Sequence, residues 1–259
     1  MTASNTSHPS RIALITGGGR GLGRSAALAL AADGVDVILT YVSNEASAQA
    51  VVSEIEAKGR RAVALRLDVG DSTAFAAFAD SVKATLAATW QRERFDFLVN
   101  NAGVGLHANF EDTTEAQFDM LFNVHLKGPY FLTQKLLPLI NDGGRIVNVS
   151  SGLTRFSMAG ASAYAAMKGG VEVLTRYLAK ELGPRRISVN TVAPGAIETD
   201  FGGGAVRDDA QLNAQIAGVT AQGRVGLPDD IGGAVAALLS EGTRWMTGQR
   251  IEVSGGMML

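Results

Sequence analysis

Short apolar runs alternate with longer amphipathic segments along this chain. Apolar runs with the length and β-branched content of strands occur at residues 12–15, 35–41, 61–67, 95–99, 145–149, 187–192 and 251–253. Helical spacing of apolar residues predicts helices at residues 22–32, 45–58, 72–90, 114–140, 162–182 and 228–239. This alternation predicts an α/β fold with one doubly wound parallel sheet of about seven strands and helices on both faces.

The pattern shows neither an internal repeat nor a linker, which predicts a single domain. The polar start of the chain predicts a disordered tail at residues 1–10, followed by one domain at 11–259. A long irregular stretch around residues 195–227 contains three successive glycines at 202–204. Because ligands of open α/β sheets bind at the carboxyl ends of the strands, we expect this stretch to form a substrate lid.

Composition excludes several classes of protein. A hydrophobic content of 46% with a net charge of −2 excludes a disordered chain and argues against a nucleic-acid partner. No uncharged apolar segment reaches the roughly 18 residues of a membrane span, and no secretion signal is apparent, so we expect a cytoplasmic protein without a membrane partner. The absence of cysteine and the three scattered histidines predict no metal site.

Five of the 31 glycines lie in the segment TGGGRGLG at residues 16–23, between the first strand and the first helix. Glycines let the backbone approach a ligand closely, and the helix N-terminus offers free N–H groups to a phosphate. The segment therefore predicts phosphate or dinucleotide binding. A P-loop of a nucleotide hydrolase or kinase is the alternative, but Arg24 stands where that motif has lysine.

Tyr164 and Lys168 are four residues apart in a predicted helix, so they share one face. A nearby ammonium lowers the pKa of a phenol and enables it to act as an acid or base on a carbonyl or alcohol oxygen. Pairs with this spacing are also common on ordinary amphipathic helices. Ser151 follows the strand at 145–149, where its hydroxyl could bind a substrate oxygen or simply cap a turn.

The chain resembles the short-chain dehydrogenase/reductase family. The resemblance rests on TGGGRGLG at 16–23, NNAG at 100–103, Asn123, Ser151, YAAMK at 164–168 and Pro194-Gly195, in the order and spacing of the family from about residue 11 to residue 256. It implies a Rossmann fold and an oxidoreductase that interconverts a ketone and a secondary alcohol by hydride transfer. APGAIETD at 193–200 and GQRIEVSGG at 248–256 look most like the 3-oxoacyl carrier-protein reductases.

The resemblance also implies a role for each matching residue. Tyr164 would donate the proton, Lys168 would lower the pKa of Tyr164 and bind the nicotinamide ribose, Ser151 would polarise the carbonyl, and Asn123 would hold a relay water. Asp68 would contact the adenine, and Ile197 and Thr199 the nicotinamide carboxamide. The implied cofactor contacts are Gly17, Gly19, Arg20, Gly21, Leu22, Gly23, Ser43, Asp68, Val69, Asn101, Ala102, Gly103, Tyr164, Lys168, Pro194, Gly195, Ile197 and Thr199.

The end of the second strand favours NADP(H) over NAD(H). An NAD site carries a carboxylate there for the ribose 2′-hydroxyl, whereas this strand ends in TYVSN at 40–44 with no acid before Glu45. Arg20 can bind a 2′-phosphate through a charge-assisted hydrogen bond, although a solvated surface arginine is the alternative. Many relatives carry a second basic residue where this chain has Val42, which lowers the phosphate affinity that we expect.

The substrate and the assembly are less defined. Carrier-protein reductases resemble one another in a basic patch, of which this chain keeps Arg185 but has PLINDGG at 138–144, so docking of an acyl carrier protein is possible but not favoured. A 3-oxoacyl thioester, another small ketone, a sugar or polyol, and a catalytically silent NADP(H) sensor remain open. The resemblance implies a homotetramer or dimer through the helices at 114–140 and 162–182, with an apolar stripe of Val171, Leu174, Leu178 and Leu182 that burial within one chain would also explain.

Overall fold

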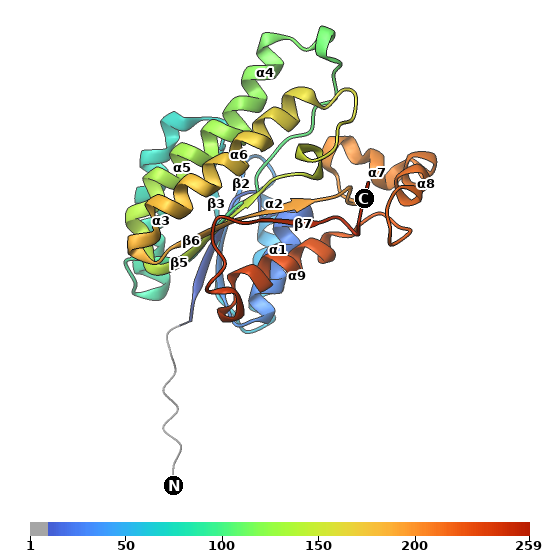
Figure 1. The fold of residues 1–259 in the computed structure, drawn as a ribbon. Coiled ribbons are helices and arrows are strands. Elements are labelled where there is room, and N and C mark those ends of the chain that lie inside the picture. Colours follow the sequence, from blue (N-terminus) through green and yellow to red (C-terminus); the bar gives the residue numbers. More distant parts are fainter. Residues whose placement is uncertain (1–9) are drawn as a thin grey trace.

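The computed structural model describes residues 10–259, so the tail expected at 1–10 lies almost entirely outside the described residues. Within this range seven parallel strands form one sheet in the order β3-β2-β1-β4-β5-β6-β7 (Figure 1). The strands are β1 (Ile12–Ile15), β2 (Asp36–Tyr41), β3 (Ala62–Arg66), β4 (Phe95–Asn100), β5 (Ile140–Val149), β6 (Ser188–Pro194) and β7 (Arg250–Val253). The predicted doubly wound sheet is confirmed. Its strand order reverses between β1 and β4, which opens a crevice at the carboxyl ends of these two strands.

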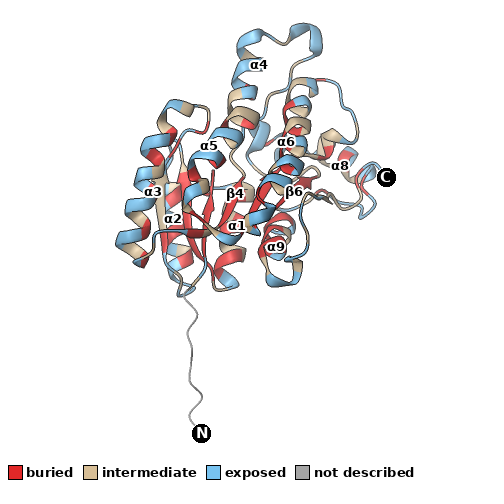
Figure 2. Ribbon diagram, turned by 60° about the vertical axis from the view of Figure 1, so that its left-hand side comes forward, coloured by how far each residue is buried: buried red, intermediate tan, exposed pale blue. Residues whose placement is uncertain are grey.

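Helices cover both faces of the sheet (Figure 1). One face packs against α1 (Gly21–Ala32), α2 (Glu45–Glu56) and α9 (Pro228–Leu239), and the other against α3 (Phe75–Trp90), α5 (Gly128–Leu136) and α6 (Ser162–Glu181). Alternate residues of β1 therefore face different cores: Ala13 and Ile15 face α1, whereas Ile12 and Leu14 face α3. This double burial explains why the strands read as continuous apolar runs, and Figure 2 shows buried strands beneath helices whose outer faces are exposed.

The predicted helix over residues 114–140 is wrong as one continuous element. The chain instead forms α4 (Glu115–Phe122), a π-helical segment (Asn123–Lys127), α5 and a 3-10 turn (Leu137–Leu139), and β5 already begins at Ile140. The physical reason lies in Pro129, which has no N–H to donate to the carbonyl of His125. The N–H of Gly128 bonds the carbonyl of Asn123 instead, five residues back.

Two of the glycines inside helices permit close packing. A Cβ at Gly232 in α9 would lie 2.7 Å from the backbone carbonyl oxygen of Ser25 in α1, and one at Gly170 in α6 would lie 2.9 Å from the side chain of Leu126. Gly169 and Gly233 have no such neighbour within 4 Å. Close packing therefore explains Gly170 in the pair Gly169-Gly170 and Gly232 in the pair Gly232-Gly233.

The irregular stretch expected to form a lid leaves the carboxyl end of β6 and returns to α9. It contains α7 (Ala205–Asp208) and α8 (Ala210–Gly218), preceded by a turn at Phe201–Gly204. Gly202, Gly203 and Gly204 all have positive φ angles, 62°, 79° and 81°, which only glycine adopts readily. The base of the stretch is tied by a bridge between Ile197 and Gly226. Closure of this stretch over a substrate stays a prediction.

Candidate active site

Three candidate catalytic side chains converge where β5 ends. Ser151 is the second residue after the strand, and α6 carries Tyr164 and Lys168. The Lys168 ammonium lies 5.6 Å from the centre of the Tyr164 ring and donates a hydrogen bond to the backbone carbonyl of Val149 at 2.7 Å. The Ser151 side chain lies close enough to the Tyr164 phenol to act on it and lower its pKa. A hydroxyl, a phenol and an ammonium thus surround one point at the carboxyl edge of the sheet.

Ser151 also closes a turn. Its hydroxyl oxygen accepts the backbone N–H of Leu153 at 3.2 Å, and its carbonyl oxygen accepts the Thr154 hydroxyl at 2.9 Å. Arg250 of β7 donates to the same carbonyl at 3.3 Å. The capping role that the sequence left open is therefore present in the structure, and it fixes the Ser151 hydroxyl beside Tyr164.

Burial moves the pKa values of the two ionisable groups in opposite directions. It raises the pKa of the Tyr164 phenol above its usual range, while the hydrogen bond with Ser151 acts to lower it. Burial lowers the pKa of the Lys168 ammonium to about 8. Loss of solvation decides the direction at the phenol, and the expected lowering of the Tyr164 pKa by Lys168 stays a prediction. Tyr164 is protonated at neutral pH and is suited to donating a proton.

The sequence analysis missed one residue of this centre, His125. Its side chain is 1% exposed, and its ring stands edge-on to Tyr164, with 5.0 Å between ring centres and 85° between ring planes. Nε2 lies 2.8 Å from the carbonyl oxygen of Val104. Burial, followed by the charge of Lys168, lowers the pKa of His125 to about 3, so the ring is neutral.

A signal for His125 was present in the sequence. Leu121, Leu132 and Leu136 are buried at helical spacing, and His125 occupies the position of this stripe that follows Leu121 by four residues. A polar ring within an apolar stripe indicates a buried polar contact.

Within the part of the chain that the structure describes, the Asn123 side chain makes no hydrogen bond to the other three candidate catalytic residues. It begins the π-helical segment, and its backbone carbonyl accepts the N–H of Gly128. Residues two apart on a helix do not share a face. Since the ring of His125 contacts Tyr164, the side chain of Asn123 points to another side of the helix. The relay role of Asn123 stays a prediction.

The predicted glycine loop and the NNAG segment meet at the crevice between β1 and β4. A Cβ at Gly17, where φ is +66°, would lie 3.0 Å from the Cα of Ala102, and one at Gly23 would overlap the carbonyl oxygen of Gly17. The Thr16 hydroxyl accepts the backbone N–H groups of Asn101 and Ala102 at 2.9 and 3.0 Å. The two segments thus pack closely against one another, and a side chain larger than that of glycine would not fit at Gly17 or Gly23.

The other predicted cofactor residues line the same carboxyl edge. Asp68 and Val69 follow β3, and the Asp68 carboxylate accepts the N–H of Gly70 at 2.8 Å. Pro194 ends β6, and a Cβ at Gly195 would lie 2.9 Å from the backbone of Ser254. Thr199 lies beside the glycine loop, because a Cβ at Gly21 would be 3.6 Å from its side chain, and Ile197 packs against the core below. Gly19 and Leu22 belong to the loop and to α1, and Gly103 lies against the ring of His125.

A second basic residue stands at the end of β2, where the sequence showed only Val42 and Ser43. Arg66 ends the neighbouring strand β3 and pairs in register with Tyr41. Its Nε donates to the carbonyl oxygen of Val42 at 3.1 Å. Arg20 precedes α1 with 72% of its side chain exposed, 3.7 Å from the carboxylate of Asp200. Arg66 was missed because strand pairing, rather than nearness in sequence, brings it there.

A cavity of about 350 Å³ opens against Tyr164. Phe201, whose ring centre is 5.9 Å from that of Tyr164, contributes one wall. The rest of the lining is predominantly apolar: Gly105, Leu106, His107, Leu153, Met158, Ala159, Ala161 and Gly202. This cavity lies between the lid segment and the loop after Ser151, so it is the candidate substrate site.

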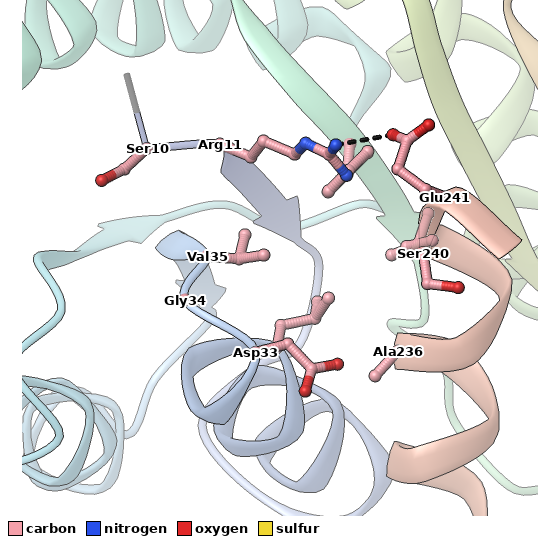
Figure 3. A pocket seen from close by; sticks show the side chains of 11 residues that line it. Ser10, Arg11, Asp33, Gly34, Val35, Ala236, Ser240 and Glu241 are labelled. Carbon is pink, nitrogen blue, oxygen red and sulfur yellow. Dashed lines mark ion pairs between the residues drawn. The ribbon is translucent and has the colours of Figure 1, made fainter. Parts of the chain in front are cut away.

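Another cavity, of about 470 Å³, lies at the opposite edge of the sheet (Figure 3). It is lined by residues at the amino end of β1 and by Ser240 and Glu241 after α9, and Arg11 pairs with Glu241 across it at 2.6 Å. None of the candidate catalytic or cofactor residues lines it. The chemistry predicted from the sequence therefore belongs to the cavity at Tyr164. Among the helices of residues 10–259, none has the length and hydropathy required to cross a membrane.

Comparison with known proteins agrees with this geometry. A family model described as enoyl-(acyl carrier protein) reductase matches residues 17–258. The chain is 36% identical over 253 residues to a short-chain dehydrogenase/reductase of Cladobotryum, FrzI, covering 96% of both chains. It is 33% identical over 258 residues to a versicolorin reductase of Emericella nidulans, covering 95% of both.

A solved structure supports the same relationship. The angucycline C-6 ketoreductase LanV, crystallised with bound NADP, superposes with a TM-score of 0.91 at 35% identity. The match covers 96% of this chain and 95% of that one. Sequence and fold are thus similar over nearly the whole length of both proteins.

Proposed function

The chain belongs to the short-chain dehydrogenase/reductase family, and we propose that it reduces a ketone carried on an apolar ring system with NADPH. The observation that carries this proposal is the apolar, Phe201-walled cavity of about 350 Å³ against Tyr164. Flat ring systems bury much apolar area in such a cavity, which favours their binding. One relative is named a versicolorin reductase and another an angucycline C-6 ketoreductase, which supports the proposal.

Each catalytic side chain has a chemical task in this reaction. When bound, the reduced nicotinamide supplies the hydride. Tyr164, kept protonated by burial, donates its proton to the carbonyl oxygen, and the Ser151 hydroxyl donates a hydrogen bond to the same oxygen. Lys168 places a positive charge beside the phenolate that forms, which stabilises it.

The phosphate of NADP would lie between Arg20 and Arg66. The Arg66 guanidinium stands at the carboxyl end of β2, and Arg20 precedes α1 at the same edge of the sheet, with its guanidinium 3.7 Å from the carboxylate of Asp200. The NADP bound to LanV supports this choice of cofactor. Val42 removes the usual second base, and Arg66 supplies a guanidinium at the same strand end. NADH use should therefore be weaker.

The alternatives fit the site less well. A 3-oxoacyl thioester presented by an acidic carrier protein would need free basic residues, but Arg185 binds Asp142 at 2.7 Å and the carbonyl of Leu137 at 3.0 Å. A sugar or polyol would leave hydroxyls unpaired against the apolar wall. A silent NADP(H) sensor would not need Ser151, Tyr164 and Lys168 arranged around one point.

We also propose a homodimer or homotetramer. Val171, Leu174 and Leu182 of the expected interface stripe are buried within one chain, so they are not available to a partner. Large apolar side chains on the outer faces of the same helices are instead exposed: Phe118, Met120, Phe122, Tyr130, Phe131, Val173 and Tyr177. Exposed apolar surface of this extent is typical of contacts between subunits. A cytoplasmic location stays a prediction.

The test is NADPH oxidation with three carbonyl compounds: tetralone for ring ketones, acetoacetyl-coenzyme A for thioesters and a sugar lactone for sugars and polyols. We expect tetralone to be reduced with the highest kcat/KM, and with NADPH rather than NADH. Faster reduction of acetoacetyl-coenzyme A would favour the thioester instead. Binding of NADPH without turnover of any ketone would favour the sensor.

A further inference from the structure

We propose that His125 is a positioning residue for the reaction. By bonding Val104 on one side and packing edge-on against Tyr164 on the other, it holds the proton-donating phenol at a fixed distance from the loop at residues 101–104. The proposal rests on the reductase function proposed above.

The ring of His125 is held from two sides. Nε2 donates to the carbonyl oxygen of Val104 at 2.8 Å, which anchors the ring to the loop that follows β4. The same loop presses on the ring at Gly103, where a Cβ would lie only 2.8 Å from Cε1 of His125. The edge-on contact with Tyr164, 5.0 Å between ring centres, is the favourable geometry for two aromatic rings. The contacts with Val104 and Gly103 thus hold the His125 ring in place against Tyr164.

Stability alone does not explain a histidine at this position. With Nε2–H donating to Val104, Nδ1 is an acceptor, and within the described residues it has no hydrogen-bond partner although it is fully buried. A buried polar atom without a partner costs free energy. Leucine occupies the neighbouring positions of the same stripe, Leu121 and Leu132, and would avoid this cost. A residue that costs stability beside a reacting group is typical of a functional role.

The local helix geometry also singles out this position. His125 is the central residue of the π-helical segment, and distortions of this kind are frequent at functional sites. Gly128 closes the segment against the carbonyl oxygen of Val69, with no space for a side chain. The segment is thereby fixed to the end of β3, so the position of His125 is set by the sheet rather than by a free helix.

The experiment compares His125→Leu, which keeps the volume but loses the bond to Val104, with His125→Gln, whose amide nitrogen reaches the position of the histidine Nε2 and can replace that bond. Thr133→Val is the matched control, because Thr133 is a buried polar residue of the adjoining α5 whose hydroxyl bonds Asn100 at 3.0 Å, away from Tyr164. Each protein is assayed for kcat and KM with NADPH and whichever of tetralone, acetoacetyl-coenzyme A and the sugar lactone the unaltered enzyme reduces fastest. NADP⁺ affinity is measured by titration calorimetry and Tm by calorimetry.

We expect His125→Leu to lower kcat by about 10- to 100-fold, as misplacement of a catalytic group does, with NADP⁺ affinity preserved and Tm equal or higher. His125→Gln should recover most of the lost kcat, and Thr133→Val should keep the kcat of the unaltered enzyme. A kcat of His125→Leu close to that of the unaltered enzyme, or an equal loss in His125→Gln, would overturn the proposal. Failure of the reductase function itself is distinguishable, because the unaltered enzyme would then reduce none of the probes.

Discussion

The ammonium of Lys168 donates a hydrogen bond to the backbone carbonyl of Val149 at 2.7 Å, with only 5% of the residue exposed to solvent. One carbonyl oxygen compensates only part of the cost of removing a cation from water. Val149, the last residue of β5, thus binds a buried ammonium that the proposed reaction requires but whose burial lowers the stability of the fold.

Lys168→Met should abolish ketone reduction and raise the free energy of unfolding at pH 7. The pKa of Lys168 falls from 10.5 to about 8 on folding, and each unit of pKa is about 1.4 kcal/mol, so we expect a gain on the order of 1–3 kcal/mol. Because the unfolded chain binds this proton more tightly, the cost is fully present below pH 8 and is relieved as the pH rises toward 10.5.

Denaturant unfolding at pH 7 and at about pH 9.5 measures both effects. The advantage of Lys168→Met over the unaltered protein should shrink at the higher pH. A variant that is less stable than the unaltered protein at pH 7 would contradict this account of the buried ammonium.

Tyr164→Phe should lower kcat by about 10²- to 10⁴-fold, because it removes the proton donor from an otherwise unchanged site. NADPH affinity, measured by fluorescence titration, should stay the same. Tyr177→Phe is the control, since Tyr177 lies on the same helix with 65% of the residue exposed. Unchanged turnover of Tyr164→Phe would refute the assigned mechanism.

Arg66→Ala and Arg20→Ala should each weaken NADPH binding by about 10-fold, because each loses a charge-assisted hydrogen bond to the 2′-phosphate. NADH binding should hardly change, since it has no phosphate there. Titration calorimetry with both cofactors measures the ratio of NADPH affinity to NADH affinity. Arg60→Ala serves as control, because Arg60 bonds the carbonyls of Gly59 and Gly34 at the opposite edge of the sheet. Equal losses of affinity for NADPH and NADH would show that these arginines do not bind the 2′-phosphate.

Phe201→Ala should lower kcat/KM for tetralone by about 10-fold, because burial of one aromatic ring contributes on the order of 1–2 kcal/mol to binding. Butanone, which is too small to reach this wall, should be reduced as before. Phe110→Ala removes an aromatic ring that is 86% exposed and controls for general effects. The same loss with both ketones would mean that Phe201 supports Tyr164 instead of the substrate.

Phe131→Glu should reduce the molar mass measured by light scattering, because a carboxylate within an apolar subunit contact is strongly unfavourable. Phe131 is 40% exposed on α5. The unaltered protein should have the mass of a dimer or tetramer at micromolar concentration. Val42→Glu adds a carboxylate at an exposed site after β2, outside the helices of the proposed contact, and should leave the mass unchanged. A monomeric unaltered protein would exclude the proposed assembly.

The local sequence was sufficient to predict those elements whose structure is determined by local interactions. The run at Ile12–Ile15 is apolar because both of its faces are covered, and Pro228 begins α9 because its missing N–H costs nothing in the first helical turn. The glycine loop was equally readable, because Gly17 and Gly23 stand where the backbone leaves no room for a side chain.

Tertiary contacts decided the features that were missed. Nothing near Val42 in the sequence announces Arg66, since the pairing of β2 with β3 brings them together. His125 was a lone polar residue in an apolar stripe until the ring of Tyr164, 39 positions further along the chain, was placed against it. The direction of the Tyr164 pKa likewise follows from the solvent that packing removes, which helical spacing does not reveal.

The pairing of β1 with β4 affects how the chain folds. This seam joins segments that are 84 residues apart, as in the bond from the N–H of Ile12 to the carboxylate of Asp96, and contacts of such separation form slowly. The glycine loop lies on one side of the seam and Ser151, Tyr164 and Lys168 lie on the other. A dinucleotide that spans it binds only the assembled sheet, so by mass action the cofactor supply of the cell also sets how much of this chain stays folded.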